Sequence, residues 1–298
     1  MKPFTQADLK GLGLASDEIE FVERMHRGGA AGGAGTHYED DYAVYRLVEA
    51  TPVYLRTGED FGVRLQDFCP VDDAVCLKGG ADCREYCQLK SGQADTWGAN
   101  SGKIERQFRL QKRICDAARI KEYRLLLITP HADRKASFDS NMPADLKGCT
   151  RVDLVKLEGK PWAEGHTTCT HLKSLCAVDP SSSSQRESIA AYYVNRVANL
   201  EGDEVCWVSE VVNRIREDPG VFLCHDRATL PPAWKDVEAS LSSIPTLVIR
   251  IQRGFCFYEC GFLSGVIARC DTESLARFAE RVIESQPKTV KDFLRILP

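Results

Sequence analysis

The sequence predicts an α/β fold, in which a mixed sheet flanked by helices is followed by a mainly helical C-terminal region. Three observations carry this prediction. A hairpin pattern occupies residues 72–90, a helical pattern follows over residues 103–118, and a short apolar run, Leu125-Leu126-Leu127-Ile128, comes next. Strand, helix and buried strand in this order are typical of a crossover between parallel neighbours in one sheet.

The segment before the hairpin predicts one helix and two short strands. Val44, Leu47 and Val48 recur at helical spacing, so a helix is expected over residues 36–50. Strands are then expected at 53–55 and 61–65.

The second strand of the hairpin has two faces, because side chains alternate along a strand with period two. One face carries Arg84, Tyr86, Gln88 and Lys90, and the other carries Glu85, Cys87 and Leu89. Gln88 and Lys90 are therefore expected to point the same way.

The second half of the chain follows a poorly patterned stretch that is rich in proline and includes the serine run 181–184, which is typical of a loop or linker. Helices are expected at residues 189–199, 203–216, 234–241, 258–269 and 272–285, and a strand at 246–251. We therefore expect two domains, residues 1–150 and residues 151–298.

The composition limits the kinds of function. The chain has 298 residues, with 39 basic and 43 acidic side chains and a net charge of −4, so it lacks the basic footprint of a non-specific nucleic-acid coat. The sequence shows no N-terminal signal-peptide pattern. Its 13 cysteines are irregularly spaced. We expect reduced thiols in a cytoplasmic protein that does not enter a membrane.

The hairpin also predicts a reactive site. It can bring the acids Asp72 and Asp73 beside Gln88 and Lys90, so that a carboxylate, an amide oxygen and an ammonium surround one point. This set suits a hard cation and an activated water. Asp73 is the favoured ligand, and Asp72 is the alternative because neighbouring strand residues face opposite sides. Glu39 on the preceding helix is a second acid that could bind a cation or orient a water.

An ordered series of motifs resembles the PD-(D/E)xK nuclease superfamily, in particular the nuclease domain of the Cap4 and DUF4297 type found in bacterial anti-phage defence. The resemblance covers roughly residues 25–135. Its motifs are Arg27-Gly28-Gly29, Gly35, Tyr38-Glu39, Asp72-Asp73 and Gln88-Leu89-Lys90.

The resemblance implies a restriction-endonuclease-like fold for residues 1–150 and cleavage of DNA with Mg²⁺ or Mn²⁺. It implies Glu39, Asp73, Gln88 and Lys90 as catalytic residues, with the first three as metal ligands. Glutamine replaces the commoner glutamate at position 88, so it would bring no charge to the cation. The resemblance also implies a homo-oligomer, a partner such as a HerA-type ATPase, and an assembly or partner-binding role for residues 151–298.

Basic residues on the helix after the hairpin form a candidate DNA-binding stripe. They recur at steps of three and four residues, which places them on one side of the helix. The members are Lys103, Arg106, Arg109, Lys112 and Arg113. A solvated helix face explains the same spacing, so both interpretations stay open.

The sequence also allows functions other than a DNA nuclease. The sequence does not separate DNA from RNA as substrate. A non-catalytic adaptor that keeps the nuclease-like fold is favoured by Gln88 and by the acidic net charge. The glycine-rich stretch 28–35 is not followed by Gly-Lys-Ser/Thr, which argues against ATP hydrolysis. His166, Cys169, His171 and Cys176 could bind zinc, although buried thiols are the more ordinary explanation.

Overall fold

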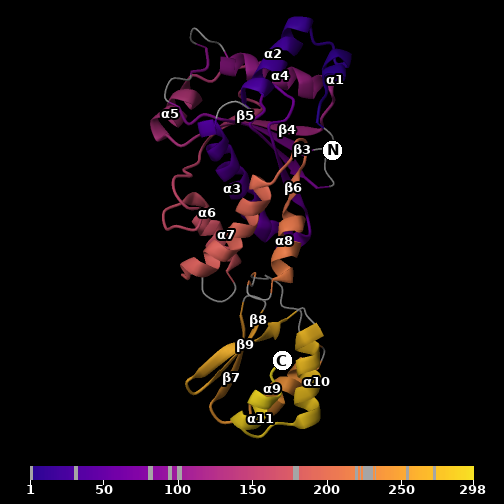
Figure 1. Cartoon of the computed structure of the whole chain (residues 1–298), viewed down its shortest axis with the longest axis vertical. Coiled ribbons are helices and arrows are strands. Elements are labelled where there is room, and N and C mark those ends of the chain that lie inside the picture. The colour runs from indigo at the N-terminus through magenta and orange to yellow at the C-terminus, as the bar shows by residue number, and fades with distance from the viewer. Residues whose placement is uncertain are drawn as a thin grey trace. The chain divides into compact units, whose positions relative to one another are not determined.

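The computed structural model describes residues 3–29, 33–79, 83–92, 96–98, 103–176, 181–218, 221, 223, 231, 233–252, 255–270 and 273–298. The chain divides into two compact units (Figure 1). The first unit contains Met1–Lys173 and Ser182–Val221, and the second contains Ser174–Ser181 and Phe222–Pro298.

The first unit is built around a six-stranded mixed sheet, with strands in the order β5-β4-β3-β2-β1-β6. β2 is antiparallel to both β1 and β3, whereas β4 is parallel to both β3 and β5, and β6 is antiparallel to β1. The strands are β1 (Phe61–Leu65), β2 (Ala74–Lys78), β3 (Cys83–Leu89), β4 (Glu122–Thr129), β5 (Thr150–Leu154) and β6 (Cys206–Trp207). The predicted hairpin is therefore confirmed as β2 and β3, and the predicted apolar strand as part of β4.

Helices flank this sheet, which confirms the α/β class with a mixed sheet. They are α1 (Gln6–Gly11), α2 (Ser16–Gly29), α3 (Gly33–Thr57), α4 (Lys103–Ala117), α5 (Ala132–Ser140), α6 (Thr167–Leu175), α7 (Ser183–Ala198) and α8 (Val208–Glu217). The glycine-rich stretch is divided between the end of α2 and the start of α3, and residues 30–32 lie outside the described ranges.

The two faces of β3 contact different helices, as the alternation predicted. Glu85 and Cys87 contact Arg46 and Tyr42 of α3. Tyr86 instead packs in a core with Phe108 of α4 and apolar residues of β4. The sheet thus lies between α3 on one face and α4 on the other.

The predicted strand at 53–55 is wrong, because α3 continues through Pro52 as one helix of 25 residues. The buried face of α3 continues past residue 50. Fully buried Thr51 donates to the Leu47 carbonyl and shares a hydrogen bond of 2.7 Å with the Tyr193 hydroxyl of α7. This packing outweighs the helix-breaking tendency of proline.

The first unit extends past residue 150, where the sequence analysis placed the end of the first domain. β6 closes the edge of the sheet by pairing with β1, so that Gly62 lies opposite Trp207. α7 and α8 both pack against α3. These later elements complete the core around α3 and β1.

The second unit combines three helices with an antiparallel sheet in the order β7-β8-β9. Its elements are α9 (Trp234–Leu241), β7 (Leu247–Gln252), β8 (Phe255–Cys260), β9 (Leu263–Arg269), α10 (Glu273–Ser285) and α11 (Val290–Arg295). Trp234, Phe278 and Phe293 are buried in its core.

Most of the predicted elements in the second half are confirmed, as α7, α8, α9, β7 and α10. The predicted helix over residues 258–269 is wrong, because this segment forms parts of strands β8 and β9. The two strands meet at Gly261, whose φ of +62° is easy only for glycine. Within the described ranges, no helix has both the length and the apolar character needed to cross a bilayer.

Candidate active site

The Asp73 carboxylate lies against the end of β3, where the sequence placed its partners. Its Oδ2 atom accepts a short hydrogen bond from Gln88 Nε2 and one of 2.6 Å from the backbone amide of Leu89. The antiparallel register explains the contact, because Ala74 pairs with Cys87 and the preceding residue therefore falls opposite Gln88. Asp73, rather than Asp72, is thus joined to the predicted glutamine.

Glu39 and Lys90 lie at the same end of the sheet. Burial and the neighbouring Asp73 carboxylate raise the pKa of Glu39 from 4.5 to about 7, while a hydrogen bond from Gln66 and the charge of Lys90 act in the opposite direction. Gln66 follows β1, and its Nε2 donates to Glu39 at 3.4 Å. One helix, α3, and the ends of two strands, β2 and β3, therefore supply the four predicted catalytic residues.

Asp72 is a buried acid beside this group. Only 4% of the residue is exposed, and its Oδ1 has no hydrogen-bond partner. Burial and the charge of Asp73 hold the pKa of Asp72 well above its usual range, and Lys90 partly offsets them. A buried acid in these surroundings is stabilised in its protonated form.

Two glutamines of α4 that the sequence analysis did not single out are fully buried, and one of them, Gln107, contacts the candidate site through Gln88. Gln107 Nε2 donates to Gln88 Oε1 at 3.0 Å, and Gln111 Oε1 accepts from the backbone amide of Val71 at 3.4 Å. Both lie on the helix face that carries the buried Ile104 and Phe108. Polar residues at i and i+4 on an otherwise apolar helix face are the signal that could have identified them.

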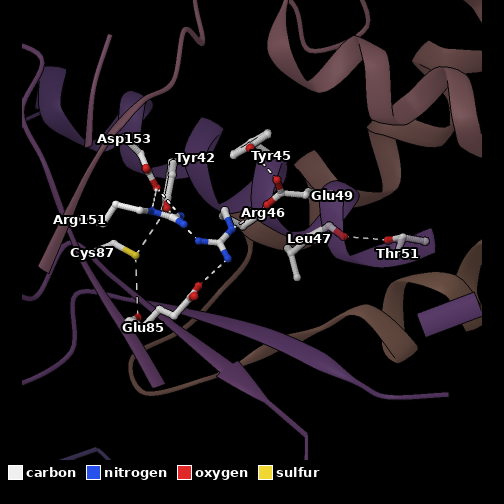
Figure 2. A network of polar contacts seen from close by, with 10 residues as sticks. All are labelled: Tyr42, Tyr45, Arg46, Leu47, Glu49, Thr51, Glu85, Cys87, Arg151 and Asp153. Carbon is white, nitrogen blue, oxygen red and sulfur yellow. Dashed lines mark hydrogen bonds and ion pairs between the residues drawn. The ribbon is translucent and has the colours of Figure 1, made fainter. Parts of the chain in front are cut away.

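A buried ion pair fixes α3, the helix that carries Glu39, against β3. Figure 2 shows the Arg46 guanidinium between Tyr42 of its own helix and Glu85 of the strand. Arg46 donates to the Glu85 carboxylate at 2.6 Å and to the Tyr42 hydroxyl at 3.0 Å, and it lies 3.1 Å from Glu49. The pair therefore ties the helix of one candidate residue to the strand of two others.

The predicted DNA-binding stripe is exposed in large part, but its described side chains are paired with acids. Arg109 binds Asp145 through two hydrogen bonds and also Glu105. Arg106 lies 3.4 Å from Asp17, Lys112 is 2.8 Å from Asp116, and Arg113 contacts Glu18. The side chain of Lys103 lies outside the described part of the chain. A phosphate at this surface would have to compete with these carboxylates.

The donor set fits a hard cation only in part. Glu39 and Asp73 offer carboxylate oxygens, which Mg²⁺ prefers, and Mg²⁺ commonly binds through one or two carboxylates while keeping several waters. Gln88 turns its NH₂ group toward Asp73, so its oxygen does not face the acid. Across the described residues, no three Cys, His, Asp or Glu side chains gather as a metal-binding group. The candidate zinc ligands His166, Cys169, His171 and Cys176 therefore do not form one.

An acidic cavity of about 360 Å³ opens beside Glu39. Its lining includes Glu39, Asp40, Asp203, Glu204 and His26. The negative charge of this lining would repel a phosphate unless cations are bound, which agrees with a cation-dependent site. Trp97, by contrast, is 3% exposed and packs edge-on against Phe108 and Phe138, so it belongs to the core.

Comparison with known proteins adds no family to this description: no family model matches the chain, and no similar curated protein or solved structure was found.

Proposed function

We propose that this protein is a metal-dependent nuclease that hydrolyses phosphodiester bonds in DNA. The observation that carries the proposal is the contact of Asp73 with Gln88 and the Leu89 amide, at the end of the sheet that Glu39 and Lys90 share. The element order α3-β1-β2-β3-α4-β4 and the mixed sheet support a restriction-endonuclease-like fold. That fold is what the motif resemblance implies.

Each residue has a role in the proposed reaction. Glu39 and Asp73 would hold Mg²⁺ or Mn²⁺, which supplies polarisation of the phosphate and a lower pKa for the attacking water. The Lys90 ammonium stabilises negative charge that develops on the phosphate. Gln88 holds the Asp73 carboxylate in place through its amide.

The test is cleavage of supercoiled plasmid DNA with Mg²⁺, with Mn²⁺ and with EDTA. We expect cleavage with either cation, and a loss of about 100-fold or more in Lys90→Ala and Asp73→Asn. Lys121→Ala is the matched control, because Lys121 is exposed and precedes β4 at the opposite end of the sheet, where Glu122 pairs with Cys83. Cleavage by Lys90→Ala at the rate of the Lys121→Ala control would refute the proposed site. Faster digestion of RNA in parallel reactions would reassign the substrate.

A second candidate function is a non-catalytic adaptor. Two observations favour it: Gln88 offers a donor to Asp73, and the described arginines of the stripe are already paired with acids. An adaptor would leave plasmid and RNA intact with every cation tested. Fluorescence anisotropy with a labelled duplex would then show whether the protein still binds DNA.

The role in antiviral defence, the homo-oligomer and the ATPase partner are proposals that rest on the resemblance of the motifs. Phage plating on cells that express the wild type or Lys90→Ala tests the first. We expect fewer plaques only with the wild type. Light scattering on the purified protein tests the second, and a monomeric mass at all concentrations would contradict it. Co-purification of a tagged chain with a co-expressed HerA-type ATPase tests the third, and failure to co-purify would contradict it.

A further inference from the structure

The carboxamides of Gln88 and Gln107 form a buried relay that ends on Asp73. Gln107 is 0% exposed and Gln88 1% exposed. Gln107 Nε2 donates to Gln88 Oε1 at 3.0 Å, and Gln88 Nε2 donates to Asp73 Oδ2. Each glutamine presents one end to its neighbour, so the orientation of one carboxamide determines the orientation of the other.

The end of this relay that lies farthest from Asp73 is the oxygen of Gln107. Gln107 Oε1 is buried and has no hydrogen-bond partner. An amide has nearly the same shape when its oxygen and nitrogen exchange places. Turning Gln107 by half a turn therefore breaks no hydrogen bond at its outer end. Gln88 could turn with it and would then donate to the oxygen of Gln107, which keeps the bond between the two glutamines.

The reversed relay differs at Asp73. In the present orientation, the carboxylate accepts a charge-assisted hydrogen bond from Gln88. In the reversed orientation, the Gln88 oxygen faces the carboxylate oxygen, and two acceptors repel each other unless a cation lies between them. The present orientation therefore suits a site without a cation, and the reversed orientation suits a site that holds one.

We propose that Gln107 is a positioning residue that lets the Gln88 carboxamide reverse, so that Gln88 donates to Asp73 in the cation-free site and offers its oxygen when a divalent cation is bound. This inference rests on the cation dependence of the proposed function. It also explains how a glutamine can stand at a ligand position while its NH₂ group faces the acid.

The test measures Mn²⁺ binding, by following free Mn²⁺ in electron paramagnetic resonance, in a cycle of variants. Gln107→Met keeps the length of the side chain and removes both amide groups. We expect it to weaken Mn²⁺ binding by about tenfold, because without Gln107 the Gln88 NH₂ group has no acceptor in the cation-bound orientation, whereas in the cation-free orientation it keeps its hydrogen bond to Asp73. In a Gln88→Glu background, both side-chain ends are acceptors and orientation no longer matters. There we expect Gln107→Met to change the dissociation constant by less than about threefold.

Gln111→Met is the matched control, because it removes an equally buried carboxamide from the same helix face without touching Gln88. We expect it to leave Mn²⁺ binding within about threefold of the wild type. Equal weakening by Gln107→Met and Gln111→Met would overturn the inference, because it would indicate a general loss of packing. Equal effects of Gln107→Met in both backgrounds would also overturn it, as would a wild type that binds no Mn²⁺.

Plasmid cleavage, recorded on the same samples, separates this inference from the proposed function. Cleavage by the wild type together with unchanged Mn²⁺ binding in Gln107→Met would leave the nuclease proposal standing and overturn the relay. Mn²⁺ binding that depends on Gln107 without cleavage of any nucleic acid would support the relay and refute the nuclease.

Discussion

The ion pair between Arg46 and Glu85 gives the sharpest prediction about stability. The two side chains are 13% and 14% exposed, and their charged atoms are 2.6 Å apart. Glu85→Ala leaves a buried guanidinium without its strand partner, a change that costs about 3–5 kcal/mol in other proteins. Because Arg46 keeps Tyr42 and Glu49, we expect the lower end of that range, about 3 kcal/mol.

The assay is urea unfolding followed by tryptophan fluorescence in a Trp234→Phe background. Trp234 belongs to the second unit, so the remaining tryptophans, Trp97, Trp162 and Trp207, report on the first unit alone. The free energy of unfolding of Glu85→Ala is compared with that of the background protein.

The matched control is Asp153→Ala, which breaks the pair between Arg151 and Asp153 on β5. Arg151 is 57% exposed there, so we expect a loss below about 1 kcal/mol. A double variant, Arg46→Met with Glu85→Leu, should be more stable than Glu85→Ala, since it leaves no buried charge unpaired. Equal losses in Glu85→Ala and Asp153→Ala would refute the argument.

Two further predictions concern Glu39 and Gly62. Burial and Asp73 raise the pKa of Glu39 to about 7. Between about pH 4.5 and pH 7, Glu39 therefore keeps a proton in the folded protein that it releases in the unfolded chain. The free energy of unfolding falls as the pH rises through this window. The melting temperature of Glu39→Gln, relative to the wild type, should therefore rise across that window, and a constant difference would contradict this. A Cβ on Gly62 would lie 2.5 Å from Val205 and 2.7 Å from Trp207. Gly62→Ala should therefore lower the free energy of unfolding by about 1–3 kcal/mol. A free energy of unfolding equal to that of the wild type would contradict the close packing.

The hairpin was predictable because its signal is local. Glycines mark the turn, and period-two alternation decides which side chains share a face. The grouping of Asp73 with Gln88 follows from these two facts alone. The placement of Glu39 needed a tertiary contact, since the pair between Arg46 and Glu85 fixes α3 on the sheet and nothing in the local pattern specifies it.

The two wrong elements show where local signals mislead. Pro52 suggested that the helix ends, but packing against α7 keeps residues on both sides of it helical. In residues 258–269, apolar residues at near-helical spacing concealed a two-residue hairpin turn at Gly261 and Phe262. A glycine between two apolar runs is a known signal for such a turn.

The division of the chain has a practical consequence for cutting it. The backbone passes between the units at residues 173–174, 181–182 and 221–222. The segment Ser174–Ser181 belongs to the second unit although it precedes residue 221 in the chain. Its Cys176 forms a β-bridge with Leu223, which follows residue 221. A gene shortened at residue 221 would therefore leave Cys176 without its bridge partner, and one shortened at residue 150 would lose β6, α7 and α8, which complete the first core.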